Sequence, residues 1–434
     1  MTIKVAATGD SLFTASFPAE YEAIRGPLDA FISDADVKIT NLETNLSDFG
    51  SYANQYSGGT WLNTRKELFP YLASFGFNFF SNANNHTMDY SYAGLLSTVD
   101  FLDEKGIAHA GTGRSLEEAE KPAILKLAGG KTAAIFAVDA SMELPSIAGR
   151  ASKSFAARPG VNYLRHETLF KVSEEEMAAL KKLAAATSVN VYRDAEIATG
   201  YQAPDPEGCF TFGSTLFTSE KDSLLSRCNK RDLARLCGNI KKAKAEHDPV
   251  FILVHCHDEE GVNECTPPAY LKEFCRAAID AGAAAVFGGG VHILRGLEIY
   301  RGKPIFYSLG DFIYQGMRVE YLPPEFMEKY GLDVDATAQE ALWVRSKGGK
   351  VGLQTNEKNF LTVVPKLTYK DGALADLVML PVKLGFQTGS ETLEGLPYRA
   401  EGDEGEKIFR KYRSLSADLG TELIYENGLI KVKG

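Results

Sequence analysis

Polar side chains of the kinds that bind metal ions follow several apolar runs of this sequence. They are carboxylates, amides and imidazoles, the groups that divalent cations take as ligands when the protein holds them rigidly. In chain order they are Asp10, Asn41, Glu43, Asn84, Asn85, His86, His255, His257, Asp258, Glu259 and His292. One such residue would carry little weight, but five separate apolar runs each end in this way. The pattern therefore predicts that side chains far apart in the chain converge on a divalent cation.

The run Asn84-Asn85-His86 follows the apolar stretch FGFNFF, where hydrogen-bonding side chains suit neither a core nor a helix interior. We interpret Asn85 and His86 as functional residues at the end of a buried strand. A hydrogen-bonded clamp of the loop is the alternative for this pair, since buried polar groups are usually hydrogen-bonded. For Asn84 the loop clamp is the favoured interpretation.

The other candidates also have structural interpretations. Asp10 after Gly9 would suit a helix N-cap, and Glu43 would suit a surface ion pair. His257 is equally consistent with a ligand and with a structural residue, although strand alternation would point it the same way as His255. Two further predictions concern their neighbours: Cys256 is buried and points away from the histidines, and Asp258 and Glu259 form a solvated acidic turn.

A glycine run precedes the last histidine, in GGGVH at 288–292. Such glycines permit a tight turn or a close approach of the backbone to an anion, and we favour the close approach. The candidate substrate contacts are Asn41, Gly289, Gly290 and Arg295. For Arg295, and for Lys303, a solvated loop charge is the safer interpretation. The remaining histidines are expected to be structural or superficial: His109, His166 and His247.

Alternating elements would position these residues. Strands are expected at 3–9, 37–43, 77–86, 131–140, 249–260 and 283–296, and helices at 27–35, 68–76, 94–106, 174–187, 231–246, 267–282 and 404–420. A hairpin is expected over 297–312, with RGKP at its turn. The stretch 141–215 is less regular, and its long loops are expected around the site. Alternation of β and α predicts an α/β sheet whose carboxyl edge collects the polar residues.

Composition excludes some classes of protein. The net charge of −10 does not suit a nucleic-acid-binding protein. The sequence has no run of apolar residues long enough for a membrane span, and its N-terminus resembles a first strand rather than a signal peptide. Six cysteines without a close-spaced pair favour free thiols in a reducing compartment. We therefore expect a cytoplasmic location for the chain as given, with membrane association through a partner or a missing anchor as the alternative.

Several segments together resemble the capsule-biosynthesis CapA-like (poly-γ-glutamate, PGA_cap) family of the calcineurin-like metallophosphoesterase superfamily. The segments are TGDSLF at 8–13, ITNLET at 39–44, NNHTMDYSYAGLLSTVDFLDEKGI at 84–107, LVHCHDE at 253–259, DAGAAAVFGGGVHILRGLEIYRGKPIFYSLGDFIY at 280–314 and SLSADLGTEL at 414–423. The resemblance covers nearly the whole chain. Its most specific parts are the NNH and GKPIFYSLGDF segments.

The resemblance implies roles for individual residues. Asp10 matches the ligand after the first strand, and Glu43 matches a carboxylate that bridges two metal ions. Asn85 matches the amide ligand of the second metal, and His86 matches the histidine that protonates the leaving group or steadies the transition state. The two imidazole ligands implied are His255 and His292. The implied cofactor is one or two divalent ions of manganese, iron or zinc.

The sequence departs from the family pattern at several positions. Gly290 stands where the family usually has an imidazole ligand, and the family's usual His-Trp-Gly is His255-Cys256-His257. We expect that His257 might replace the missing nitrogen. Asp311 stands where the family usually has Asn. The site is therefore expected to hold two metals by a changed ligand set, one metal, or none.

The implied fold is an α/β, four-layer metallophosphoesterase-like sandwich of two mixed sheets flanked by helices. The domain would span 1–315, and the extension 316–434 would pack on it; within the extension, 323–339 has no family counterpart and suits a lid or a partner contact. The implied function is a metal-dependent hydrolase acting on a phosphoester or on a poly-γ-glutamate-type polymer. The alternative is a non-catalytic component of capsule polymer synthesis or export, which binds polyglutamate in a degenerate metal site beside other capsule-synthesis proteins.

Overall fold

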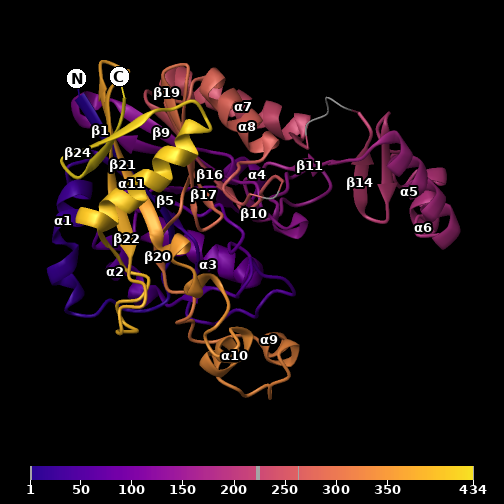
Figure 1. The fold of residues 1–434 in the computed structure, drawn as a ribbon, viewed down its shortest axis with the longest axis horizontal. Helices are drawn as coiled ribbons and strands as arrows, with labels where there is room; N and C mark the ends of the chain where they lie inside the picture. The colour runs from indigo at the N-terminus through magenta and orange to yellow at the C-terminus, as the bar shows by residue number, and fades with distance from the viewer. Residues whose placement is uncertain (1, 221–224, 262, 434) are drawn as a thin grey trace.

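Strands and helices alternate through a mixed α/β fold, as the sequence pattern predicts (Figure 1). The structure is a computed structural model that describes residues 2–220, 225–261 and 263–433. Most of the helices and strands fall where the sequence predicts them. Within the described part of the chain, no helix combines the length and apolar character needed to cross a lipid bilayer.

The first sheet contains ten strands among the described residues, in the order β24–β25–β22–β21–β1–β2–β5–β6, with β20 beside β1 and β23 beside β22. β1 is parallel to β2 and β20 but antiparallel to β21, so the sheet is mixed. The strands are β1 (Thr2–Leu12), β2 (Val37–Leu42), β5 (Phe79–Ser81), β6 (His109–Ala110), β20 (Asp311–Tyr314), β21 (Leu361–Lys370), β22 (Ala373–Leu384), β23 (Pro397–Arg399), β24 (Leu423–Glu426) and β25 (Leu429–Val432).

The second sheet contains six strands among the described residues, in the order β18–β19–β17–β16–β9–β8. Its four inner strands are parallel, and the strand at each edge pairs antiparallel with its neighbour. The strands are β8 (Ala123–Lys126), β9 (Thr132–Asp139), β16 (Val250–Cys256), β17 (Ala285–Gly290), β18 (Leu294–Tyr300) and β19 (Lys303–Leu309).

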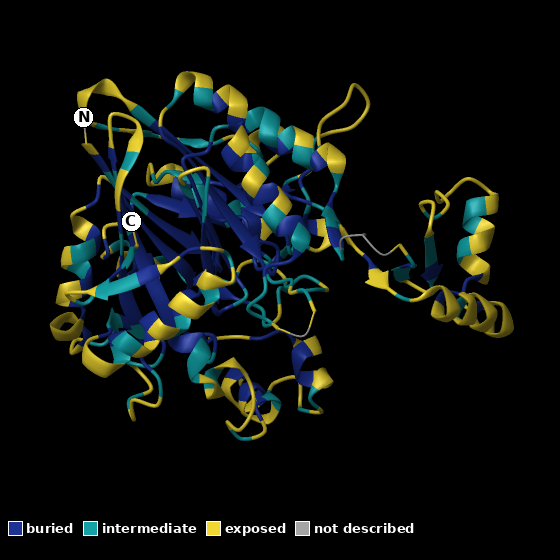
Figure 2. Ribbon diagram, turned by 45° about the horizontal axis from the view of Figure 1, so that its top comes forward, coloured by how far each residue is buried: buried dark blue, intermediate teal, exposed yellow. Residues whose placement is uncertain are grey.

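The two sheets pack face to face. One core cluster joins Val5 and Ile39 of the first sheet to Phe251 and Phe287 of the second, and the rings of Phe251 and Tyr369 lie 5.9 Å apart across the interface. Figure 2 shows these strands as the buried centre of the molecule. Full burial of one such large apolar side chain contributes roughly 1.5–3 kcal/mol, so this interface fixes the sheets against each other.

Helices cover the outer faces of both sheets. On the second sheet, α7 (Lys230–Glu246) and α8 (Ala269–Ala281) bury residues such as Leu236 and Phe274. On the first sheet, α1 (Tyr21–Ser33), α2 (Phe69–Ala73) and α3 (Ser91–Glu104) bury Leu28, Leu72 and Leu102. The prediction of amphipathic helices at these positions is confirmed.

The first helix begins earlier than predicted, because the sequence analysis started it at Pro27. α1 begins at Tyr21 and contains Pro27 in its interior. Proline removes one backbone hydrogen bond and usually ends a helix. Here Tyr21, Arg25, Leu28 and Ile32 form a buried stripe at helical spacing, and this burial outweighs the lost bond.

The predicted hairpin is confirmed as β18 and β19. Tyr300 pairs with Lys303, so the turn consists of Arg301 and Gly302. Both turn residues have positive φ, +50° and +73°, the geometry that matches the right-handed twist of the flanking strands.

Parallel register brings the polar ends of the strands to one edge. Asp10 lies opposite Asn41 of β2 and Asp311 of β20 in the first sheet. In the second sheet His255 lies opposite Gly289 of β17 and Asp139 of β9. Because the sheets face each other, the two sets of strand ends meet in the space between them.

Two segments lie outside this core (Figure 1). The first contains α5 (Glu174–Thr187) and α6 (Val191–Ala198) beside the small sheet of β12 (Phe170–Lys171), β14 (Thr215–Thr218) and β13 (Cys209–Phe212). The predicted α5 is confirmed, although most of this stretch forms a projecting lobe rather than loops around the site. The second contains α9 (Pro324–Lys329) and α10 (Ala338–Arg345).

Candidate metal centre

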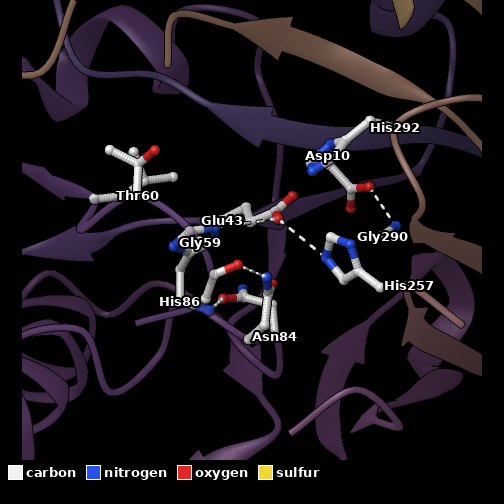
Figure 3. Close-up of polar contacts among 12 residues, drawn as sticks. Asp10, Glu43, Gly59, Thr60, Asn84, His86, His257, Gly290 and His292 are labelled. Atoms are coloured by element: carbon white, nitrogen blue, oxygen red, sulfur yellow. Dashed lines mark hydrogen bonds and ion pairs between the residues drawn. The ribbon is translucent and has the colours of Figure 1, made fainter. Parts of the chain in front are cut away.

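Carboxylates and imidazoles from both sheets converge at the shared edge (Figure 3). Two overlapping groups have ligand-type atoms within 4.8 Å of one another. One group is Glu43, His257 and His292, and the other is Asp10, Glu43, His292 and Asp311. Glu43 and His292 belong to both groups, so they lie at the middle of the cluster.

Glu43 follows β2 and is wholly buried, yet neither of its carboxylate oxygens has a hydrogen-bond partner among the described residues. Burial raises the pKa of Glu43 well above its usual range, and the nearby carboxylates of Asp10 and Asp311 raise it further. A buried carboxylate without partners is costly, since buried charges are normally paired or coordinate a metal. A divalent cation against these two oxygens fits both the burial and the lack of partners.

Three nitrogen and oxygen atoms surround one oxygen of Glu43. His255 Nε2 lies 3.5 Å from Glu43 Oε1, and His257 Nε2 lies 3.9 Å from the same atom. His255 Nε2 is also 3.1 Å from His257 Nε2 and 2.8 Å from Asn85 Oδ1. Ligands about 2.0–2.2 Å from one ion lie at comparable mutual distances, so this set of four residues has the spacing of a metal site.

Asp10 is held by the strands around it. Asn41 Nδ2 donates to Asp10 Oδ1 at 2.7 Å, and the backbone N–H of Gly290 donates to Oδ2 at 2.6 Å. Burial alone would raise the pKa of Asp10, but the neighbouring His255, His292 and the Gly290 amide lower it below its usual value. Asp10 is therefore held as a carboxylate. The N-cap alternative for Asp10 is wrong, because Asp10 lies within β1.

His292 lies in the loop between β17 and β18 with φ +58°, a left-handed conformation that few non-glycine residues adopt. Its Nδ1 is 2.8 Å from Asp311 Oδ1, and its carbonyl accepts a hydrogen bond from Asn359. Burial lowers the pKa of His292, but Asp311 outweighs this and raises it overall. Strain of this kind persists where the surrounding contacts enforce it, and it is often found at functional sites.

His86 also faces the centre. Its Nδ1 is 2.6 Å from Asp89 Oδ2, and its Nε2 is 3.9 Å from Glu43 Oε1. Asp89 accepts two backbone N–H groups as well, from Gly58 and Leu62. With Nδ1–H donated to Asp89, Nε2 of His86 is directed at the centre.

Asp89 is a site residue that the sequence analysis missed. Its signal was the spacing in NNHTMD, which places an acid three residues after His86. Asp139 at the end of β9 was also missed, and burial raises its pKa to about 6. Asn84 is the loop clamp expected of it, since its amide donates to the carbonyl of Leu42.

The glycines approach a protein carboxylate. A Cβ on Gly289 would lie 2.5 Å from Asp10 Oδ1. Gly290 has φ +107°, and a Cβ there would lie 2.7 Å from the backbone of Cys256. Close approach thus brings β17 against Asp10 and β16.

Two charge interpretations from the sequence are wrong. Arg295 is fully buried and donates to the carbonyls of Asp258 and Glu264, so it braces the loop beneath the surface instead of being a solvated loop charge. Asp258 is half-buried and accepts a 2.5 Å hydrogen bond from Tyr270, whereas Glu259 is exposed as expected. The fixed strand ends around Arg295 explain the error, since sequence alone does not show what covers a loop.

Other neighbours lie as predicted. Cys256 is buried and its Sγ is 3.2 Å from the hydroxyl of Tyr270, on the side away from the histidines. The three histidines outside the motifs make structural contacts: His109 with Asp103, His166 with the Tyr270 ring, and His247 with Thr132.

A cleft of about 1190 Å³ opens over the centre. His86, His257 and His292 line it, together with Tyr314 and Arg345. A cavity of this size accommodates a substantial ligand or a segment of polymer, and the imidazoles of the cluster are accessible from it.

Comparison with known proteins places this site in a family. Residues 4–316 match the family described as "Bacterial capsule synthesis protein PGA_cap". The uncharacterized proteins y4sH and y4uA of Sinorhizobium fredii are each 31% identical over 411 residues, which cover 92% of this chain and 86% of theirs. The PGA biosynthesis protein CapA of Bacillus subtilis is 24% identical over 253 residues, which cover 58% of this chain and 47% of CapA.

Proposed function

Because the chain belongs to the PGA_cap family of bacterial capsule synthesis proteins, we propose that it is a metal-dependent hydrolase of a phosphoester or a poly-γ-glutamate-type polymer. The observation that carries this proposal is the buried Glu43 carboxylate, which lacks partners within the described residues and lies among imidazoles and acids of both sheets. The proposed fold is the four-layer metallophosphoesterase-like sandwich. Two facing mixed sheets with helices outside support it.

The cluster has room for two ions that share Glu43. One site would use Asp10, Glu43, His292 and Asp311, and the other would use Glu43, Asn85, His255 and His257. His257 then supplies the nitrogen that Gly290 does not. A mixed carboxylate, amide and imidazole set suits manganese, iron or zinc. Bound there, such ions lower the pKa of a coordinated water and stabilise negative charge on substrate oxygens.

The residues of this chain divide the remaining tasks. Asp89 holds His86 so that Nε2 faces the cleft and the centre, where an imidazole can pass a proton to a leaving group near neutral pH. Asn41 and the Gly290 amide orient the carboxylate of Asp10. Asn84 fixes the loop that carries Asn85 and His86.

A second function remains a candidate because of one observation. Gly290 cannot be an imidazole ligand, and the relatives named for PGA biosynthesis and polyglutamine synthesis are described as biosynthesis or accessory proteins. A non-catalytic component that binds a capsule polymer, beside other capsule-synthesis proteins, would need the cleft but no turnover. The two functions differ in whether a bound metal supports hydrolysis.

The test is metal analysis followed by hydrolysis assays. Purified protein is analysed for manganese, iron and zinc, then assayed with bis(p-nitrophenyl) phosphate and with poly-γ-glutamate in added Mn²⁺. We expect metal-dependent turnover that falls at least about 100-fold in His86→Ala, with metal content retained. His109→Gln, which changes a histidine outside the cluster, is the matched control and should keep full turnover.

Two results would exclude the hydrolase. The first is protein that binds no metal under any loading condition. The second is metal-loaded protein that releases no product from either compound yet binds poly-γ-glutamate, which would support the polymer-binding component.

A further inference from the structure

A cation from outside the family match lines the cleft. Arg345 is the last residue of α10, and the match to the family ends at residue 316. Its guanidinium lines the same cleft as His86, His257 and His292. The sequence analysis found no family counterpart for 323–339 and did not consider Arg345.

The guanidinium of Arg345 contacts neutral groups. Nη1 donates to the hydroxyl of Thr60, and Nη2 lies 3.9 Å from the sulfur of Met317. Within the described residues no carboxylate forms an ion pair with Arg345, whereas other half-buried arginines of the protein have one: Arg165 pairs with Asp232, and Arg193 with Asp205. A guanidinium held by neutral partners in a cleft keeps donors for an anion.

The contact with Thr60 links Arg345 to the metal centre. Thr60 belongs to the loop 57–60, whose Gly58 donates its N–H to Asp89 at 2.9 Å and accepts from Asn85 Nδ2 at 2.8 Å. Figure 3 shows Gly59 and Thr60 on the side of the centre occupied by His86. The guanidinium is therefore fixed relative to Asn85 and His86.

The helix that carries Arg345 is anchored to the core. Ala341 and Leu342 of α10 pack in a cluster with Leu12 and Tyr314, and Leu12 belongs to the strand that carries Asp10. A capping box between Thr337 and Glu340 defines the start of the helix. This packing gives Arg345 a defined position at the cleft wall.

The rest of the cleft is acidic on another segment. Asp258, Glu259 and Glu260 line it. Asp258 is engaged by Tyr270, and Glu260 accepts hydrogen bonds from Ser226 and from the backbone of Ala269. These carboxylates would repel an anion, so an anionic group in the cleft is favoured near Arg345.

We propose that Arg345 binds an anionic oxygen group of the substrate, a phosphate or a carboxylate, beside the metal centre. The planar guanidinium offers two parallel N–H donors that match the oxygens of either group. This inference deepens the proposed function and rests on it, since it assigns the charge of the substrate that the same site takes. It makes Arg345 a specificity-determining residue supplied by the segment beyond the family match.

Equilibrium binding tests the inference without requiring turnover. Calorimetric titration with inorganic phosphate and, separately, with a γ-linked glutamate oligomer distinguishes the two sources of the anion. We expect the Kd of the anion that wild-type protein binds to rise at least about 10-fold in Arg345→Gln, since a charge-assisted hydrogen bond contributes about 1.5–3 kcal/mol. Arg345→Lys, which keeps the charge but not the fork, should weaken binding less.

Two controls accompany the titration. Arg410→Gln removes the same charge from an exposed position on α11 (Gly402–Ala417) and should leave the Kd unchanged. Metal content and thermal unfolding of Arg345→Gln should match wild type, because its neutral contacts lie outside the metal ligands.

The outcomes separate this inference from the proposed function. An unchanged Kd in Arg345→Gln, or no binding of either anion to wild-type protein, overturns the inference even if metal-dependent hydrolysis is observed. Binding that depends on Arg345 in a protein that holds no metal and hydrolyses nothing supports the anion site and overturns the hydrolase.

Discussion

At the scale of single residues, Glu43 determines what the site requires. Its carboxylate is wholly buried between acids, and both its oxygens lack hydrogen-bond donors within the described part of the chain. In metal-free protein this group must be protonated or destabilising. A cation changes that balance, so metal binding and folding stability are coupled at this residue.

Glu43→Gln should separate the two effects. The neutral amide removes the buried charge, so the metal-free variant should unfold at a higher temperature than metal-free wild type near pH 8. Wild-type protein should gain about 2.7 kcal/mol when Mn²⁺ is present at 100 times its Kd, whereas the variant should gain little. Calorimetric melting with and without metal measures both, and an equal gain in the two proteins would contradict the shared role of Glu43.

Asp89→Asn should test how His86 is positioned. The amide would replace a carboxylate 2.6 Å from His86 Nδ1 and would weaken control of which ring nitrogen carries the proton. We expect kcat to fall about 100-fold, the magnitude typical of general acid–base catalysis, with KM and metal content near wild type and a shifted pH–rate profile. An unchanged profile with unchanged kcat would show that Asp89 only supports the loop through Gly58 and Leu62.

At the scale of helices and strands, the sequence shows which residues end strands but not how the strands meet. Apolar runs predict β1, β2 and β16, and polar residues after each run predict the sheet edge that carries the site. The position of Asp311 beside Asp10 depends on the pairing of β20 with β1, which joins residues 301 positions apart. Local pattern contains no information about such pairing.

The glycine run at the end of β17 has a prediction of its own. Gly290→His would restore the residue type that the family pattern implies, yet we expect it to destabilise the protein. Its φ of +107° and the Cys256 backbone 2.7 Å from a new Cβ add strain of about 1–3 kcal/mol and overpacking of about 1–3 kcal/mol. Urea denaturation measures the loss.

Gly302→Ala provides the matched control for that change. Gly302 has φ +73° but nothing within 4 Å of a new Cβ, so only the backbone term applies. Gly290→Ala should therefore cost more than Gly302→Ala. Equal costs would mean that the packing of β17 against β16 is looser than the distances imply.

At the scale of the whole molecule, each sheet supplies about half of the centre. Asp10, Glu43 and Asn85 follow strands of the first sheet, and His255 and His292 follow strands of the second. Arg345 comes from a segment whose sequence shows no strong periodicity and whose place depends on burial against Leu12 and Tyr314. For this reason the ligand set was largely predictable from the sequence, whereas the cation in the cleft was not.

The stability of metal-free protein should depend on pH in a definite direction. Burial raises the pKa of Glu43 well above its usual range, and it raises the pKa values of Asp139 and Asp311 to about 6. Acids with a raised pKa bind protons more tightly in the folded state, so the free energy of unfolding should fall as pH rises from about 4 through 6 and above. The lowered pKa of His257, caused by burial and by His255, acts in the opposite direction near its usual value.

Urea denaturation of metal-free protein between pH 5 and 8 measures this dependence. We expect the free energy of unfolding to decrease across this range for wild type and to decrease less for Glu43→Gln. Parallel curves for the two proteins would contradict the assignment of the effect to Glu43.

The pairing of β1 with β21 has a consequence for how the protein is made. β1 is the first strand to leave the ribosome, yet one of its neighbours comes from residues 361–370. Asp10 therefore emerges long before its strand can complete its pairing, and the imidazoles of residues 255 and 292 follow in between. Capture of the metal would then be a late event, after most of the polypeptide has been synthesised, and the nascent chain would present only scattered ligands to the metal pool of the cell.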